Sequence, residues 1–151
     1  MFNYKDCVKE GLLRKIPPSN EKANKSIEKA ERWLMEARNT LAGGSCDSSV
    51  LASYMAMFHS ARAILFFDGW REKSHACIAR YLEELYVKTG RLEKKWVELL
   101  DHHREIRHNE QYDLSFSSTQ KEAEEALKSA SDFLEIMKKL LNSISGKKSS
   151  L

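Results

Sequence analysis

The sequence predicts an all-α protein, folded as an antiparallel bundle of four to five helices. Apolar residues make up 42% of its 151 residues and charged residues 31%, a balance typical of one globular domain. Only six glycines and two prolines occur, too few for the many turns of a β-sandwich or barrel. Apolar side chains recur at steps of three and four residues, and no segment shows a strand pattern. We expect an N-terminal arm (1–19), a helical bundle (20–144) and a flexible C-terminal tail (145–151).

The first long helix is predicted to start directly after the N-terminal arm. Two consecutive prolines close the arm, because proline cannot continue a helix. Ser19-Asn20 then offers an N-cap ahead of Glu21, and a pair of glycines at 43–44 ends the helix. One face of this helix carries its apolar side chains: Ile27, Ala30, Leu34, Ala37 and Leu41.

The second helix is predicted to lie at the centre of the bundle. Asp47 is placed to cap its start, and the helix ends at Gly69. Large side chains cover much of its girth, so we expect neighbouring helices on more than one side. They form two adjacent stripes: Leu51, Tyr54, Phe58, Ala61 and Leu65 in one, and Met55, His59, Arg62 and Phe66 in the other.

Three more helices complete the predicted bundle. Ser74 begins a third, shorter helix that ends at Gly90. The fifth helix opens at Ser117, because Ser117 and Gln120 have the spacing of a capping box. Short connections between amphipathic helices favour antiparallel packing. The predicted inward residues are Ile78, Leu82 and Tyr86 in the third helix, Leu92, Trp96, Leu99, His103 and Ile106 in the fourth, and Ala126, Ala130, Phe133, Met137 and Leu140 in the fifth.

Charge and cysteine content limit the classes of partner and the compartment. The formal net charge is +3 with both signs mixed along the chain, so a broad nucleic-acid-binding face is not predicted, although a local positive pocket is compatible. Cys7, Cys46 and Cys77 are odd in number and far apart, which suggests neither a zinc site nor a disulfide framework. We find no secretory signal and no run of roughly 18 apolar residues. The expected location is therefore the reducing cytoplasm, without a membrane partner.

Five histidines fall between residues 59 and 108, and each one alone is most simply a residue without a chemical role. His102 and His103 are neighbours that point about 100° apart on a helix, and no HExxH motif accompanies them. We therefore predict no metal and no other cofactor. Ser60 follows His59 directly, and adjacent helical positions do not face each other. With no Gly-x-Ser-x-Gly elbow, Walker loop or dinucleotide fingerprint, a serine–histidine enzyme or a nucleotide-fold enzyme is not indicated.

The segment REIRHNEQYDL gathers two arginines, a histidine and a tyrosine near the end of the fourth predicted helix. Arg104 and His108 lie four residues apart on one face, and Arg104 and Arg107 lie three apart. A guanidinium beside an imidazole can bind a phosphodiester and move a proton, which metal-independent RNA cleavage requires. In the competing interpretation, which spacing alone favours, Asp101 and Glu105 neutralise these arginines on a solvated helix face.

Three stretches together show the pattern of a known family: LLRKIPPS near the N-terminus, YMAMFHSARAILFFDGWREKSHACI at 54–78, and RHNEQYD at 107–113. In this order they resemble the small all-helical HEPN domains (higher eukaryotes and prokaryotes nucleotide-binding), and specifically the stand-alone prokaryotic members. The family's His-Ala-Ala-Arg pattern corresponds to HSAR at 59–62, and its Lys-Thr/Ser-His pattern to KSH at 73–75. The similarity covers most of residues 8–141, and the combination is fairly specific.

The resemblance implies a helical homodimer, often encoded beside a small nucleotidyltransferase with which it forms a toxin–antitoxin-like pair. In catalytic members the dimer joins two Arg-x(4–6)-His motifs into one ribonuclease site. Here Arg107 is followed at that spacing by Tyr112, and no arginine of the chain has a histidine at the required distance. Tyrosine, with a pKa of about 10, transfers protons poorly at pH 7, but it can donate a hydrogen bond to phosphate and stack on a base. The motif therefore favours binding over catalysis.

Two positions outside this motif are further candidates. Arg62 projects from the central helix beside His59, where a buried cation must pair with a carboxylate or face a cleft or dimer seam. His75 falls near the start of the third helix, where free backbone N–H groups favour anions. A surface histidine at a helix end is the competing interpretation of His75.

The leading prediction is a HEPN-type subunit that binds a nucleotide, an RNA phosphate or a nucleotidyltransferase partner. Its predicted binding residues are His59, Arg62, His75, Arg104, Arg107 and Tyr112. Two alternatives remain open. One is a metal-independent ribonuclease toxin that uses Arg104 or Arg107 with His108. The other is a non-catalytic helical interaction scaffold whose polar cluster is structural.

Overall fold

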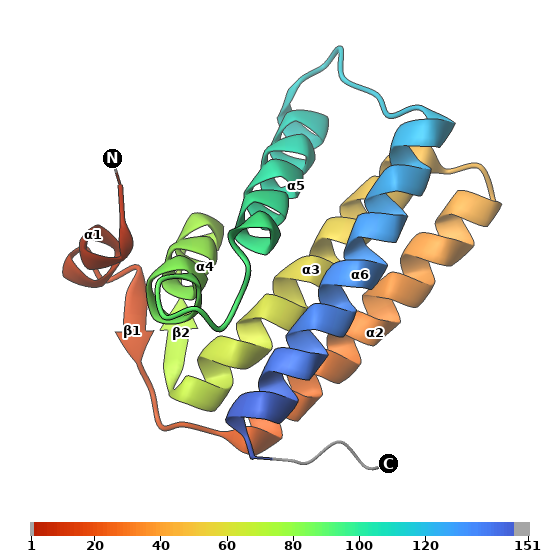
Figure 1. Ribbon diagram of the computed structural model, residues 1–151. Coiled ribbons are helices and arrows are strands. Elements are labelled where there is room, and N and C mark those ends of the chain that lie inside the picture. Colours follow the sequence, from red (N-terminus) through yellow and green to blue (C-terminus); the bar gives the residue numbers. More distant parts are fainter. Residues whose placement is uncertain (1, 147–151) are drawn as a thin grey trace.

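A computed structural model describes residues 2–146, which form six α-helices, one short π-helix and one small sheet (Figure 1). The long helices α2 (Asn20–Ala42), α3 (Cys46–Asp68) and α6 (Gln120–Ile144) pack side by side, and α5 (Lys94–Tyr112) lies along α3 on the side away from α2. Consecutive long helices run in opposite directions. This arrangement confirms the predicted all-α bundle.

The predicted start and apolar face of α2 are confirmed. The Ser19 hydroxyl oxygen accepts the backbone N–H of Lys22 at 3.0 Å, which satisfies one of the free donors of the first turn. Gly43 follows the last helical residue and forms its C-cap. The buried residues of α2 recur on one face, where they pack against α3 and α6: Ala23, Ser26, Ile27, Ala30, Leu34 and Ala37.

The central position predicted for the second helix is confirmed, because α3 packs against α2, α5 and α6. By length and composition alone α3 could also cross a membrane, and 72% of its most apolar window is buried inside the bundle. His59 and Arg62 interrupt its apolar side chains, so α3 still contains no run of roughly 18 apolar residues. Burial by three neighbouring helices accounts for its hydrophobicity, as for the core helix of any bundle.

The N-terminal segment contributes a helix and a strand, so the prediction of no strands is wrong. Helix α1 (Tyr4–Lys9) leads into β1 (Leu13–Lys15), which pairs antiparallel with β2 (Trp70–Glu72) directly after α3. Each strand has three residues, too few for an alternating pattern to show in a sequence. Gly69 makes the turn from α3 to β2 at a φ of 90°, and its carbonyl accepts the N–H of Ile16 at 3.0 Å.

Cys7 and Cys77 form a disulfide, a bond that the number and spacing of the cysteines did not suggest. Both side chains are fully buried, and the bond joins α1 to the first turn of α4 (His75–Leu82). The two residues are 70 positions apart and meet only because β1 carries α1 back to the start of α4. The argument from unpaired cysteines to a reducing compartment therefore loses its basis.

The predicted start of the second helix is also corrected. Ser45 takes the N-cap position of α3, and Asp47 lies inside the first turn. The Asp47 carboxylate instead accepts the backbone N–H of Ser118 at 2.7 Å, so it ties the loop between α5 and α6 to the start of α3. Asp47 is thus a tertiary contact rather than a cap.

The last helix begins at Gln120 and not at Ser117. Thr119 and Glu122 form the capping box, in which each side chain accepts the backbone N–H of the other residue. Helix α6 ends at Ile144, and residues 147–151 of the predicted tail lie outside the described residues.

The third predicted helix consists of α4 followed by the π-helix η1 (Glu83–Val87). Both segments are fastened to the end of α3 through Asp68, whose carboxylate accepts the hydroxyl groups of Tyr81 at 2.7 Å and Tyr86 at 2.5 Å. The C-terminal end of α4 is held by Asp68, and its N-terminal end is held by the disulfide. The first turn of α4 therefore has a fixed position beside α5.

Candidate functional site

A cleft of about 570 Å³ lies between the first turn of α4 and one face of α5. We call it the α4–α5 cleft. It brings together four of the residues singled out from the sequence, although they come from two separate elements. Its lining consists of Ser74, His75, Ala76, Arg104, Glu105, Arg107, His108 and Asn109.

His75 is the first residue of α4 and is held from below by aromatic residues of α3. Its Nδ1 shares a hydrogen bond with the Tyr54 hydroxyl at 2.9 Å. Its ring stacks on Phe58 with the ring centroids 4.1 Å apart. Burial, and then the charges of Arg107 and Arg104, lower the pKa of His75 to about 4. The imidazole is therefore neutral at pH 7 and can exchange hydrogen bonds without adding charge.

Arg107 carries the available positive charge of the cleft. Its guanidinium lies over the ring of Tyr54, with 5.7 Å between the guanidinium carbon and the ring centroid. No carboxylate within residues 2–146 forms an ion pair with it. An arginine held by an aromatic ring rather than by an acid keeps its donors free for a ligand.

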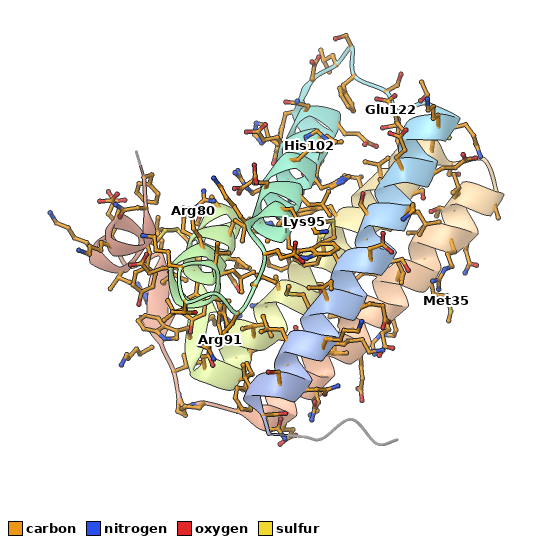
Figure 2. All side chains as sticks on the ribbon, viewed as in Figure 1. Met35, Arg80, Arg91, Lys95, His102 and Glu122 are labelled. Carbon is orange, nitrogen blue, oxygen red and sulfur yellow. A yellow bond between two sulfur atoms is a disulfide. The ribbon has the colours of Figure 1, made fainter. Side chains whose placement is uncertain are left out.

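Arg104 belongs to a small network of ion pairs between α4 and α5. Its guanidinium lies 3.3 Å from one oxygen of Asp101, whose other oxygen lies 2.6 Å from Arg80 on α4. Figure 2 shows Arg80 where α4 approaches the lower end of α5. Arg80 also pairs with Glu83 at 3.5 Å, so these two arginines lie against two carboxylates, Asp101 and Glu83. Asp101 pairs with Arg104, as expected if acidic residues neutralise the arginines of this helix face. Glu105 forms no ion pair with Arg104 or Arg107 in the described part of the chain.

The start of α4 adds backbone donors to the cleft. Ser74 occupies the N-cap position, but its side chain makes no capping hydrogen bond. The first N–H groups of a helix have no partner within the helix and favour negative charge. Since Ser74, His75 and Ala76 line the cleft, this helix terminus faces the same space as the two arginines. Together these groups form a surface of hydrogen-bond donors.

Arg62 and His59 lie on α3, outside the lining of the α4–α5 cleft. Arg62 forms an ion pair with Glu72 of β2 at 2.6 Å. A carboxylate partner was one of the arrangements expected for this buried cation. Its guanidinium also lies 4.9 Å from the ring centroid of Phe66. His59 is buried, and this burial, followed by the charges of Lys29 and Arg62, lowers its pKa to about 4.

Tyr112 is not among the residues that line the cleft. It is the last residue of α5 and 70% exposed, and its ring packs against His108 with 4.8 Å between the ring centroids. Five residues of helix correspond to a rotation of about 140°, so Tyr112 and Arg107 project from different faces of α5. Of the pair that replaces the ribonuclease motif, only Arg107 lines the cleft.

The donor set fits an anion better than a metal ion. Within residues 2–146 no group of three or more His, Cys, Asp or Glu side chains is arranged to hold a metal. The cleft instead offers guanidinium and imidazole groups and backbone N–H groups, which bind phosphate through charge-assisted hydrogen bonds.

The sequence did not indicate two residues that hold the site. Tyr54 was assigned only to the apolar stripe of the second helix, yet it contacts both His75 and Arg107. Arg80 was not singled out, although it pairs with Asp101. Neither contact has a local signal, because the partners are 21 residues or more apart and come from different helices.

Comparisons with known proteins agree with this fold. The model of the HEPN domain family matches residues 23–140. A protein of Methanocaldococcus jannaschii named "Putative toxin MJ0142" is 29% identical over 117 residues, 78% of this chain and 80% of that protein. A second protein of this organism, "Putative toxin MJ0605", is 28% identical over 118 residues, 78% of this chain and 87% of that protein. "UPF0332 protein PH1297" of Pyrococcus horikoshii is 30% identical over 84 residues, 56% of this chain and 59% of that protein.

Proposed function

Because this chain belongs to the HEPN domain family, we propose that it is a toxin-like HEPN subunit whose α4–α5 cleft binds phosphate groups of RNA or of a nucleotide. The observation that carries the proposal is the position of Arg107, which has no carboxylate partner within the described residues and shares the cleft with neutral His75. The uncapped start of α4 supplies further donors to the same space.

The biological setting follows from the relatives. Two of them carry names that call them toxins. We therefore extend the proposal to a toxin–antitoxin-like pair in which a homodimer of this chain associates with a nucleotidyltransferase. Exposed Tyr112, at the end of α5, is free to meet such a partner because it does not line the α4–α5 cleft.

The binding proposal is tested with the full chain and a 5′-labelled single-stranded RNA in the presence of EDTA, by fluorescence polarisation. Arg107→Ala is expected to weaken binding at least tenfold, because a phosphate loses its main charged donor. Arg38→Ala is the matched control, since Arg38 is an exposed arginine that lines none of the hollows described. Equal affinities of wild type and Arg107→Ala would contradict the proposal and leave the scaffold interpretation.

A second candidate function is metal-independent cleavage of RNA. It is favoured by one observation: His108 lines the same cleft as Arg104 and Arg107, so an imidazole outside the usual motif spacing is close to the arginines. The test is turnover of an oligoribonucleotide in EDTA. Cleavage that is lost in His108→Ala and kept in His102→Ala would establish this function, whereas intact RNA after long incubation would exclude it.

The partner proposal needs a separate experiment. We expect a nucleotidyltransferase encoded beside this chain to co-purify with it, and Tyr112→Ala to reduce the recovered complex. Intact-mass measurement of the co-purified chain would also reveal a covalent adduct. Recovery of this chain alone, at the mass of its sequence, would contradict the pairing without affecting the binding proposal.

A further inference from the structure

A second hollow adjoins the α4–α5 cleft. It has a volume of about 430 Å³ and lies where α3 is exposed between α2 and α5. Its floor is apolar, with Leu51 and Met55 of α3 and Trp33 of α2. Arg107 lines this hollow and also the α4–α5 cleft, so the two spaces are neighbours at this residue.

A third hollow continues the path onto α2. It has a volume of about 350 Å³ and is lined by Lys29, Arg32, Trp33 and Glu36. Trp33 and Glu36 also line the second hollow, so these two spaces are neighbours as well. We call this row of three neighbouring hollows the α5–α2 track. Figure 1 shows α3 between α5 and α2, the two helices that the track joins.

The track alternates in chemical character. Arg107 and half-buried Trp33 both line the middle hollow. Exposed Lys29 and Arg32 line the third hollow together with Trp33. No carboxylate within residues 2–146 pairs with any of these three cations. Glu36 is the acidic residue of this stretch, so three cations oppose one carboxylate. Lys29 and Arg32 also contribute to the lowered pKa of His59, a sign of positive potential at this end.

We propose that the α5–α2 track binds single-stranded RNA several nucleotides long. One phosphate binds at Arg107, a base lies against Trp33, and a later phosphate binds between Lys29 and Arg32. This inference rests on the proposed phosphate-binding function and extends it to a substrate class. Alternating cations and aromatic surface match a single strand, whose bases are free to stack on side chains while the phosphates face the cations.

Other occupants fit the track less well. A mononucleotide fills only the α4–α5 cleft and leaves Trp33 and Arg32 unused. In a duplex the bases stack on each other and are unavailable to Trp33. A second copy of the chain could cover the apolar floor. In a symmetric dimer, however, the track of one copy would face the track of the other, and their positive charges would repel. A dimer seam at this place is therefore the rival that the experiment must exclude.

The test compares labelled oligoadenylates of two and eight nucleotides with the full chain in EDTA. The octanucleotide is expected to bind at least tenfold more tightly than the dinucleotide. Trp33→Leu should weaken octanucleotide binding about tenfold, because one stacked base is lost, and leave the dinucleotide unchanged. Met35→Leu is the matched control, since Met35 is 60% exposed and points outward from α2 (Figure 2).

The charged end of the track has its own test. The double variant Lys29→Gln, Arg32→Gln should weaken octanucleotide binding and lower the salt dependence, the slope of log K against log salt, by about 1.4, because two phosphate contacts are lost. Arg38→Gln on α2 should change neither quantity.

Failure of this inference is distinguishable from failure of the proposed function. If Arg107→Ala weakens both oligonucleotides while Trp33→Leu and the double variant change neither, the cleft binds phosphate but the track is refuted. If the wild type binds neither oligonucleotide, the proposed function fails as well. Light scattering of Trp33→Leu without RNA checks the rival. Conversion of a dimer into a monomer by this variant would identify the track as a dimer seam and overturn the inference.

Discussion

Arg62 and Glu72 form an ion pair beneath the site, with side chains 18% and 7% exposed. Burial raises the pKa of Glu72 although Arg62 acts in the opposite direction, so the carboxylate depends on its partner for solvation. Arg62→Met is expected to lower the free energy of unfolding by about 3–5 kcal/mol at pH 7, because the charge of Glu72 is left buried and unpaired. Urea unfolding measures this loss.

The double variant Arg62→Met, Glu72→Leu should recover much of the stability, because an apolar pair can replace a buried ion pair. Arg38→Met, an exposed arginine without such a partner, should be close to wild type. If Arg62→Met had the same urea midpoint as wild type, the pair would have no structural role.

The lowered pKa of His75 predicts how the affinity of the cleft for an oligonucleotide depends on pH. Burial and two arginines lower its pKa to about 4, and a bound phosphate would oppose these charges and raise it. A ligand that raises a pKa binds the protonated form more tightly. The affinity for an oligonucleotide is therefore expected to rise as pH falls from 7 towards 5. His75→Phe keeps the stacking but should lose this rise, and a pH-independent wild type would contradict the role of His75.

At the residue scale the sequence identified the arginines and histidines of the cleft but not their surroundings. His75, Arg104, Arg107 and His108 were found because motif similarity and helical spacing are local properties. The distance from Arg107 to Tyr112 was known from the sequence, yet their separation around α5 became evident only when α4 fixed which face of the helix lines the cleft. The contacts of Tyr54 depend on where α4 and α5 cross α3, which no local pattern encodes.

At the scale of single elements, Gly69 determines how α3 joins β2. Its φ is +90°, and an added Cβ would lie 2.8 Å from both the carbonyl oxygen of Ile16 and the Cγ atom of Pro18. Gly69→Ala is expected to destabilise the protein by on the order of 3 kcal/mol, because backbone strain and a clash add up. Gly44→Ala, at a φ of +82° with nothing within 4 Å, should cost only about 1 kcal/mol. Thermal unfolding of the two variants measures this difference. If Gly69→Ala and Gly44→Ala lost the same stability, the clash at Gly69 would be relieved by a local shift.

Glu110 predicts a pH effect at the other end of α5. Burial and the nearby Asp47 raise its pKa to about 7, and its side chain accepts the Ser118 hydroxyl at 3.3 Å. A raised pKa in the folded state favours the protonated form, so its stabilising contribution is present at low pH and is lost as pH rises through 7. Glu110→Gln resembles the protonated form. It should raise the melting temperature by roughly 2–4 °C at pH 8 and leave it unchanged at pH 4.5.

Glu105→Gln is the matched control for this effect, because Glu105 is an exposed residue of the same helix. It should show no difference between the two pH values. A gain for Glu110→Gln of the same size at both values would mean that the substitution acts through packing and not through ionisation.

The elements that the sequence predicted are those with enough residues to show a period. Helices α2, α3 and α6 each span more than six turns, and their buried faces match the predicted stripes. The two three-residue strands and the Cys7–Cys77 bond arise from contacts between distant segments. The N-cap of α6 was placed two residues early because Ser117 and Gln120 copy the spacing of the true pair, Thr119 and Glu122.

For the whole molecule, buried histidines predict instability in acid. His59 and His103 are 5% and 6% exposed, and burial lowers the pKa of each to about 4 from the ordinary value of 6.5. Between these two pH values the unfolded chain binds more protons than the folded chain, so stability falls as pH falls. At pH 5 each histidine is expected to remove on the order of 2 kcal/mol. Glu110 opposes this trend between pH 7 and 4.5, but a single group does not offset two.

Urea midpoints at pH 7.5 and pH 5 measure this acid effect. His103→Leu should show a smaller difference between the two midpoints than wild type, because one buried imidazole is gone. His108→Leu, at an exposed position, should behave as wild type. A wild-type midpoint that is the same at both pH values would contradict the assignment.

The small ribbon of β1 and β2 matters for how the molecule can be shortened. The family match starts at residue 23, after α1 and β1. Yet the carbonyl of Leu12 accepts the N–H of Lys73 at 2.8 Å, next to the serine that opens α4, and Cys7 is bonded to the first turn of that helix. A chain trimmed to the matched region would keep every arginine discussed above. It would lose the two contacts that hold the first turn of α4 at the α4–α5 cleft. Expression boundaries should therefore begin ahead of Asn3, whatever the borders of the family suggest.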